Sequence, residues 1–170
     1  MAFVSVLGAL THGLTMSESL RVMLWRPLYL SLGLIVGLFL VGAVYDWRGR
    51  AAARRLVPWS IGLGIIFFLV TEIFSDAFII FVFYEAVAMT VSLMIYSFLA
   101  ATNRLNGAII VATAVFLNLA AAGVQASSFS FTLLVPFDHN GVFHLVQMVG
   151  LAILGIGLHL GLKPVEIKTD

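Results

Sequence analysis

Long stretches of this sequence lack Asp, Glu, Lys and Arg, and this pattern decides the class of fold. Residues 27–45, 56–71 and 139–162 contain none, and residues 77–101 contain only Glu85. A helix needs about 20 apolar residues to cross the roughly 30 Å hydrocarbon core of a bilayer. The chain is 62% hydrophobic and 10% charged, which leaves too few polar residues to cover a soluble domain. We therefore predict an all-α polytopic membrane protein.

The apolar segments divide into about five spanning helices, which we expect to form one bundle and a single domain over residues 1–170. Residues 57–101 must contain a turn, because roughly 45 helical residues would extend about 67 Å, too far for one crossing. Ser75-Asp76 is the polar break in this segment, and Asp76 would cap the next helix. The predicted spans are 28–45, 57–74, 77–101, 107–125 and 141–162, preceded by a short interfacial segment at residues 1–14.

The start of the first long helix has a recognisable pattern. Thr15-Met16-Ser17-Glu18 fits a capping box, in which Thr15 is the N-cap and the Glu18 side chain reaches back to it. Arg21, Trp25 and Arg26 follow, and such residues are typical of the headgroup boundary.

Glycines spaced along two of the spans predict close helix packing. Gly33 and Gly37 lie four residues apart, and Gly42 extends this face loosely. Small residues at this spacing let a second helix approach closely. The last span also contains several glycines, at positions 150, 155, 157 and 161.

Basic residues indicate the orientation of the chain. The segment Asp46–Arg55 contains Arg48, Arg50, Arg54 and Arg55, and short basic loops stay in the cytoplasm. We therefore expect an N-terminus outside, a C-terminus in the cytoplasm, and a bacterial-type inner membrane as the location. No Lys or Arg precedes the first apolar run, so we do not expect a cleaved signal peptide.

Composition also limits the chemistry. The chain has no cysteine and a net charge of +1. It therefore offers no thiolate metal ligand, no cysteine nucleophile and no basic patch for nucleic acid. No phosphate-binding glycine loop is present in the sequence.

Nearly all the polar residues of the spans lie in one half of the membrane, the outer half in the predicted topology, and His159 is the exception in the inner half. Glu85 lies about 13 Å below Asp76 along its helix, and Asn118 lies about 10 Å from the outer end of its own. Asn140, His144 and Gln147 follow at i, i+4 and i+7, which places them on one face if the helix includes Asn140. The full set is Glu72, Asp76, Glu85, Asn118, His139, Asn140, His144 and Gln147.

Three interpretations of this cluster are open. The first is a buried hydrogen-bond network of Glu85, Asn118, His144 and Gln147 that fixes the helix register. The second is a site for zinc, iron or manganese. Its ligands would be His144 with some of His139, Glu85, Glu72 and Asp76. The third is a pocket for a lipid or another apolar ligand whose head the polar side chains hold.

The segment FDHNGVFHLVQ, residues 137–147, resembles the last-helix motif of the CREST-type membrane hydrolases, which include the alkaline ceramidases and the progestin/adiponectin receptors. That motif is His-x-x-x-His before an apolar run. Here Asn140-x-x-x-His144 stands at the same spacing, with Asn140 in place of the first histidine. The sequence also has about five spans where the family has seven. Ser75 and Glu85 match a serine and an acidic residue on two earlier helices, without the accompanying histidine.

The resemblance implies a metal-assisted amide or ester hydrolase that acts on lipid. A metal-bound water would be the nucleophile. His144 would be a ligand, and Glu85 a ligand or general base, so these two are the expected catalytic residues.

The leading hypothesis is therefore a small membrane protein that binds a metal or lipid at an outward-facing polar site, with hydrolysis as the activity that the resemblance implies. The alternative is a non-catalytic structural subunit of a larger membrane complex. Its glycine faces and aromatic helices would pack against other membrane subunits.

Overall fold

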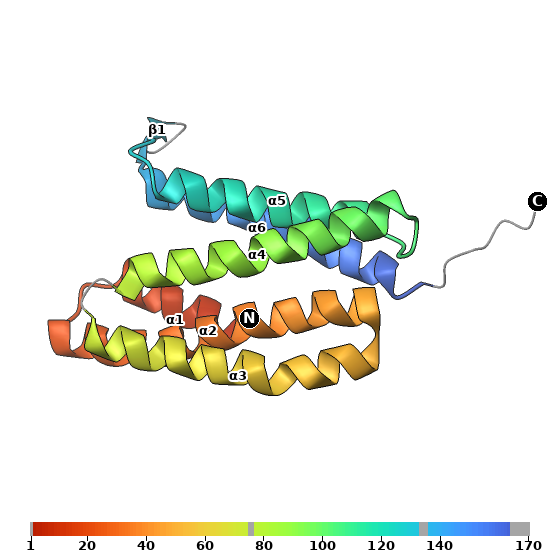
Figure 1. The fold of residues 1–170 in the computed structure, drawn as a ribbon. Coiled ribbons are helices and arrows are strands. Elements are labelled where there is room, and N and C mark those ends of the chain that lie inside the picture. Colours follow the sequence, from red (N-terminus) through yellow and green to blue (C-terminus); the bar gives the residue numbers. More distant parts are fainter. Residues whose placement is uncertain (1, 75–76, 133–135, 164–170) are drawn as a thin grey trace, which may run out of the picture. The chain divides into compact units, whose positions relative to one another are not determined.

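The fold is all-α, as the sequence predicts (Figure 1). A computed structural model describes residues 2–74, 77–132 and 136–163. In this described part, five helices are long and apolar enough to cross a membrane. The helices are α1 Ala2–Gly13, α2 Glu18–Arg48, α3 Arg50–Ile73, α4 Ala77–Ala101, α5 Ala108–Gln125 and α6 His139–Gly161.

Contacts divide the chain into two compact units, residues 1–88 and 89–170. The first unit contains α1, α2, α3 and the beginning of α4. The second contains the rest of α4 with α5 and α6. The arrangement of all spans in one bundle stays a prediction.

In the first unit, α2 and α3 pack as antiparallel neighbours through small residues. A Cβ on Gly33 would lie 3.1 Å from the Gly64 carbonyl oxygen, and a Cβ on Gly37 would lie 3.1 Å from the Ser60 carbonyl oxygen. The predicted small face of Gly33 and Gly37 is thus confirmed, and its partner is a similar pair four residues apart on α3. Gly42 has no neighbour within 4 Å at its Cβ position, so it is not part of this contact.

The basic segment that joins α2 and α3 is helical, which corrects the prediction of a loop from Asp46 to Arg55. Only Gly49 interrupts the helices, with φ +79° and its amide donating to the Tyr45 carbonyl oxygen at 2.8 Å. A positive φ favours glycine because it has no Cβ. One residue therefore suffices to reverse the chain, and α3 begins at Arg50 rather than near residue 57.

The start of α2 also differs from the predicted one. Ser17, not Thr15, is the N-cap, and its hydroxyl accepts the Leu20 amide at 3.4 Å. Glu18 does not reach back to Thr15 but pairs with Arg21 one turn further along. Pro27 lies inside a continuous α2. Residues 2–13 form α1, which packs against α2. The interfacial location of this segment stays a prediction.

The first half of α4 is held in this unit by two aromatic residues. The Tyr84 hydroxyl donates to the Gly33 carbonyl oxygen at 3.0 Å, and its ring stacks on Phe67 of α3 at 5.5 Å. Phe81 packs against the same Phe67 ring at 5.8 Å. These contacts fix which face of α4 points to α2 and α3.

In the second unit, α5 and α6 pack antiparallel, again through glycine. A Cβ on Gly157 would lie 2.9 Å from the Val111 amide nitrogen, and a Cβ on Gly150 would lie 2.7 Å from Nδ2 of Asn118. Gly155 is exposed, with no atom within 4 Å of its Cβ position. The expected close packing of α6 thus depends on the glycines that face α5.

The connection between α5 and α6 contains a short hairpin that the sequence did not predict. Strands β1 Phe131–Thr132 and β2 Pro136–Phe137 pair antiparallel. Asp138 then caps α6, because its carboxylate accepts the Gly141 amide at 2.8 Å. The helix therefore begins at His139, two residues before the predicted start.

Candidate functional site

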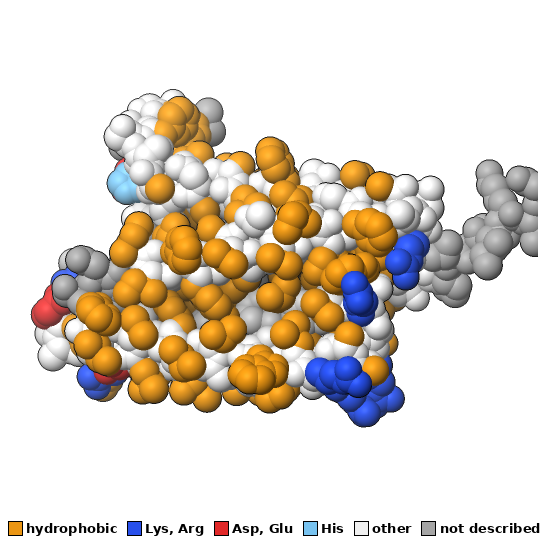
Figure 2. Space-filling model, viewed as in Figure 1, with side chains coloured by type: hydrophobic (Ala, Val, Ile, Leu, Met, Phe, Trp, Pro, Cys, Tyr) orange, Lys and Arg blue, Asp and Glu red, His pale blue; other side chains and the backbone are white. Residues whose placement is uncertain are grey.

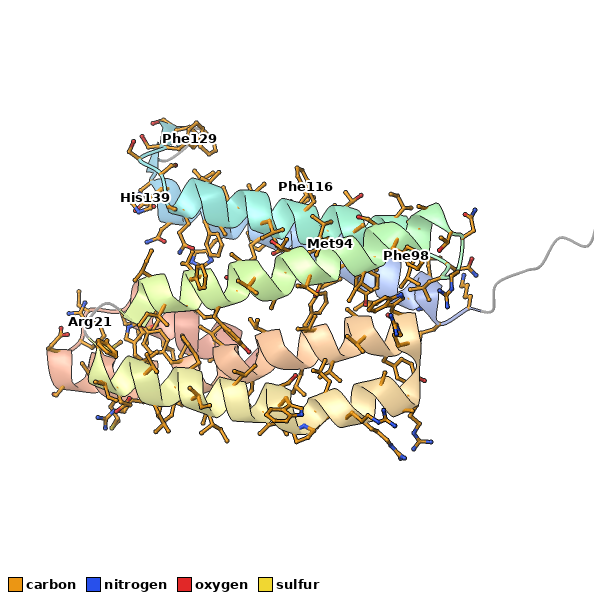
Figure 3. The ribbon with its side chains drawn as sticks, viewed as in Figure 1. Arg21, Met94, Phe98, Phe116, Phe129 and His139 are labelled. Carbon is orange, nitrogen blue, oxygen red and sulfur yellow. The ribbon has the colours of Figure 1, made fainter. Side chains whose placement is uncertain are left out.

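A groove of about 590 Å³ lies in the first unit, where α2 begins and α3 ends. It combines charged, aromatic and apolar side chains within a short distance. The residues that line it are Glu18, Arg21, Val22, Trp25, Arg26, Tyr29, Thr71, Glu72, Ile73 and Phe74. Figure 3 shows Arg21 at this end of α2.

The α2 side of the groove is one helical face. Arg21, Trp25 and Tyr29 follow at i, i+4 and i+8, so their side chains lie one above the other. The Trp25 and Tyr29 rings are 5.2 Å apart. Tyr29 also makes an edge contact with Phe67 at 6.3 Å, which ties this face to α3.

Two acid–base pairs supply the charge of the groove. Arg21 pairs with Glu18 along α2, and an Arg26 nitrogen lies 2.9 Å from a Glu72 oxygen across to α3. The Arg26 side chain is 59% exposed and that of Glu72 is 30% exposed. The lining therefore has two positive and two negative groups that remain accessible to a ligand.

The groove lies just beyond the charge-free part of α2. About 20 residues separate Arg26 from Asp46 on α2 without a charge between them. This length corresponds to about 30 Å of helix, the thickness of the hydrocarbon core. Figure 2 agrees with this spacing: on the face drawn, apolar side chains cover the sides of the helices and charged ones gather at the ends.

The structure assigns different positions to the acidic residues of the predicted cluster. Glu72 is the groove residue paired with Arg26, and Asp76 lies outside the described residues. Glu85 is half-buried on α4, next to Tyr84. Within the described residues its carboxylate makes no hydrogen bond or ion pair.

Amide side chains of the second unit lie between α5 and α6. Nε2 of Gln125 donates to Oδ1 of Asn140 at 3.0 Å. Nδ2 of Asn118 donates to the Ala114 carbonyl oxygen at 2.8 Å, and the side chain rests against Gly150. Asn118 and Asn140, which were predicted as site residues, therefore support the packing of α5 on α6.

The two histidines of the predicted site, His139 and His144, lie in the first turns of α6, the end where Asn140 bonds to Gln125. Since the helix begins at His139, the condition that places Asn140, His144 and Gln147 on one face is met. His139 and Gln147 are half-buried, while His144 is exposed, with its ring 4.9 Å from that of Phe143. Figure 3 shows His139 at the first turn of α6, below the hairpin.

A metal centre receives no support from this geometry. Among the described residues, no three His, Asp or Glu side chains come together in a group that could hold a metal ion. The expected ligands Glu72 and Glu85 belong to the first unit, and His139 and His144 to the second. Asp76, the remaining expected ligand, lies outside the described residues, so the metal site stays a prediction. The hydrogen-bond network of Glu85, Asn118, His144 and Gln147 also stays a prediction.

Sequence reasoning did not assign a ligand site to Arg21, Trp25 and Arg26, although it placed them at the headgroup boundary. Their spacing along α2 was visible in the sequence. The acidic partner of Arg26, Glu72, lies on the next long helix, and only the register of α2 against α3 brings the two together.

The comparisons with known proteins identify a family whose function is unknown. The model of a family of unknown function, DUF6962, matches residues 1–163. The chain belongs to this family. No curated protein and no solved structure matches it. Membership in DUF6962 therefore leaves the chemistry of the groove as the basis for a functional proposal.

Proposed function

We propose that this protein is an integral membrane protein that binds a phospholipid in the groove between α2 and α3. The observation that carries the proposal is the lining of this groove, which combines two arginines with three aromatic residues and the apolar side chains of Val22 and Ile73. Guanidinium groups bind phosphate through paired hydrogen bonds. The polar head of a phospholipid has the phosphate that such groups recognise.

The depth of the groove supports the same ligand. Arg21 and Arg26 stand just beyond the uncharged part of α2, where the phosphates of a leaflet lie. Trp25 and Tyr29 lie below Arg21 on the same face, at the level that amphipathic rings prefer. The glycerol and ester groups would contact these rings, and the acyl chains would follow the apolar sides of α2 and α3.

The proposal includes the location and orientation expected from the basic residues. The membrane is a bacterial-type inner membrane, with the N-terminus and the groove outside and Arg48–Arg55 in the cytoplasm. Since the chain has no cysteine, single substitutions Ser19→Cys and Ala51→Cys can report each side. An impermeant maleimide added to intact cells should label Ser19→Cys and not Ala51→Cys. The reverse pattern would contradict this orientation.

Binding is tested with purified protein in nanodiscs or by mass spectrometry of retained lipid. We expect the double variant Arg21→Gln/Arg26→Gln to retain at least fivefold less phospholipid than the wild type. The matched control is Arg54→Gln/Arg55→Gln, which removes two exposed arginines at the far end of α3. Equal lipid retention by both double variants would contradict the proposal and favour the structural-subunit alternative.

Hydrolysis of the bound lipid is the activity that the resemblance to CREST-type hydrolases implies. It would require His144 and Glu85 to act together, and neither residue lines the groove. The groove itself contains acids and bases already engaged in pairs. We therefore propose binding as the function and keep hydrolysis as a prediction of the resemblance.

A further inference from the structure

The charges that line the groove indicate which phospholipid headgroup fits it best. This inference rests on the proposed function. Arg21 and Arg26 would favour any phosphate. Glu18 and Glu72 are within reach of the same ligand, since both line the groove. An anionic headgroup would bring its net negative charge to a lining that is neutral overall. A zwitterionic headgroup would match both signs.

The geometry of the pairs favours a primary amine over a quaternary one. Glu72 accepts from Arg26 at 2.9 Å, yet 30% of its side chain remains exposed, and 72% of the Glu18 side chain is exposed. An ionised carboxylate has about four acceptor positions in its two oxygens. A primary ammonium group has three N–H donors to place on them, whereas a trimethylammonium group has none.

The aromatic residues do not offer an alternative site for a quaternary amine. Binding of trimethylammonium groups relies on cages in which several aromatic faces surround the cation. Three aromatic residues line the groove here, Trp25, Tyr29 and Phe74. The Trp25 and Tyr29 rings pack against each other at 5.2 Å, and Tyr29 also contacts Phe67, so these two rings do not enclose a cation between them. The acidic oxygens remain as the groups that can recognise the amine.

We propose that the groove selects phospholipids with a primary ammonium headgroup, of the phosphatidylethanolamine type. The phosphate lies against the guanidinium groups of Arg21 and Arg26, and the ammonium donates to the carboxylates of Glu18 and Glu72. The lipid thereby inserts into two existing ion pairs and satisfies all four groups without leaving a charge uncompensated.

The test measures competition among three headgroups. Wild-type protein is placed in nanodiscs that contain equal amounts of phosphatidylethanolamine, phosphatidylcholine and phosphatidylglycerol, and the lipids retained after extraction into detergent are counted by mass spectrometry. We expect phosphatidylethanolamine to exceed each of the others at least fivefold. In Glu18→Gln/Glu72→Gln, which keeps the shape but removes both carboxylates, this preference should fall to within twofold.

The outcomes separate this inference from the proposed function. Retention that depends on Arg21 and Arg26 without a preference for phosphatidylethanolamine would overturn the headgroup assignment alone. A preference that survives Glu18→Gln/Glu72→Gln would also overturn it. Retention independent of both arginines would overturn the lipid site as well. Circular dichroism and size-exclusion profiles like those of Arg54→Gln/Arg55→Gln show that the variants are folded.

Discussion

The Arg26 guanidinium lies 2.9 Å from the Glu72 carboxylate and joins the beginning of α2 to the last turn of α3. We expect this pair to contribute little to stability, because exposed ion pairs are worth about 0.2–1 kcal/mol. A double-mutant cycle with Arg26→Gln and Glu72→Gln, measured by thermal unfolding in detergent, should give a coupling energy in that range. The coupling should decrease at high salt. A coupling energy above about 2 kcal/mol would exceed the range for exposed ion pairs. It would mean that the pair stabilises the fold, and would argue against a role in ligand binding.

Gly33 lies at the closest approach of α2 and α3, and Gly33→Ala should destabilise the first unit. The added Cβ would meet Phe67 at 2.7 Å and the Gly64 backbone at 3.1 Å. Since the backbone cannot move aside, we expect a loss of about 1–3 kcal/mol. Gly42→Ala is the matched control, because its Cβ position is open and alanine favours a helix by up to about 1 kcal/mol. Equal melting temperatures for the two variants would argue against this packing.

Gly157 and Gly155 form a similar pair two residues apart on α6. The Cβ of Gly157→Ala would lie 2.9 Å from the Val111 amide nitrogen, whereas nothing lies within 4 Å of the Cβ position of Gly155. We expect Gly157→Ala to lower the stability by about 1–3 kcal/mol and Gly155→Ala to leave it unchanged or higher. Thermal unfolding in the same detergent compares them. The opposite order would show that α6 presents its other face to α5.

Tyr84 carries the hydrogen bond between α4 and α2, and Tyr84→Phe should have a modest effect. Interhelical hydrogen bonds in membranes contribute about 0.6 kcal/mol on average. The Gly33 carbonyl that accepts this bond also lies within reach of an amide four residues on in its own helix, so it is not left without a donor. Tyr84→Leu should cost more, because it also removes the stacking on Phe67. Tyr45→Phe at an exposed position controls for the loss of a hydroxyl.

Glu85 is the one carboxylate in the apolar part of α4, and Glu85→Gln should stabilise the protein. A charged side chain at the centre of a spanning helix costs about 2.5–3.5 kcal/mol on insertion scales. Because Glu85 is half-buried and lies toward one end, we expect a gain of about 1 kcal/mol, less than the central value. Glu18→Gln, at an exposed position, is the comparison variant. If Glu85→Gln unfolds more easily than Glu18→Gln, the Glu85 carboxylate has a stabilising partner.

The ends of two predicted spans agree with the ends of the helices. In these spans the helix stops where the apolar segment gives way to charged or polar residues. The range 77–101 matches α4, and 107–125 differs from α5 by one residue. Agreement is poorer where helix continues beyond the apolar part. The segment Asp46–Arg55 is helical apart from Gly49, since solvated arginines are compatible with a helix and only the positive φ of Gly49 breaks it.

The candidate site was less accessible to sequence reasoning than the fold. The polar residues at one end of the spans were visible as a set, but their pairing was not. Gln125 bonds to Asn140, and Glu72 pairs with Arg26. The sequence contains each side chain, whereas its partner depends on the rotation of each helix about its axis.

By itself, the sequence determined that this chain forms spanning helices, because long apolar segments must satisfy every backbone group internally in a bilayer. It also determined how far apart the charged residues lie along each helix, since every helical residue adds about 1.5 Å. Only the tertiary structure decided which residues meet. The approach of Gly33 to Gly64 fixes the register of α2 against α3, and that register brings Arg26 to Glu72 and forms the groove. The physical reason is that contacts between helices depend on the shape of both surfaces, which neither segment specifies alone.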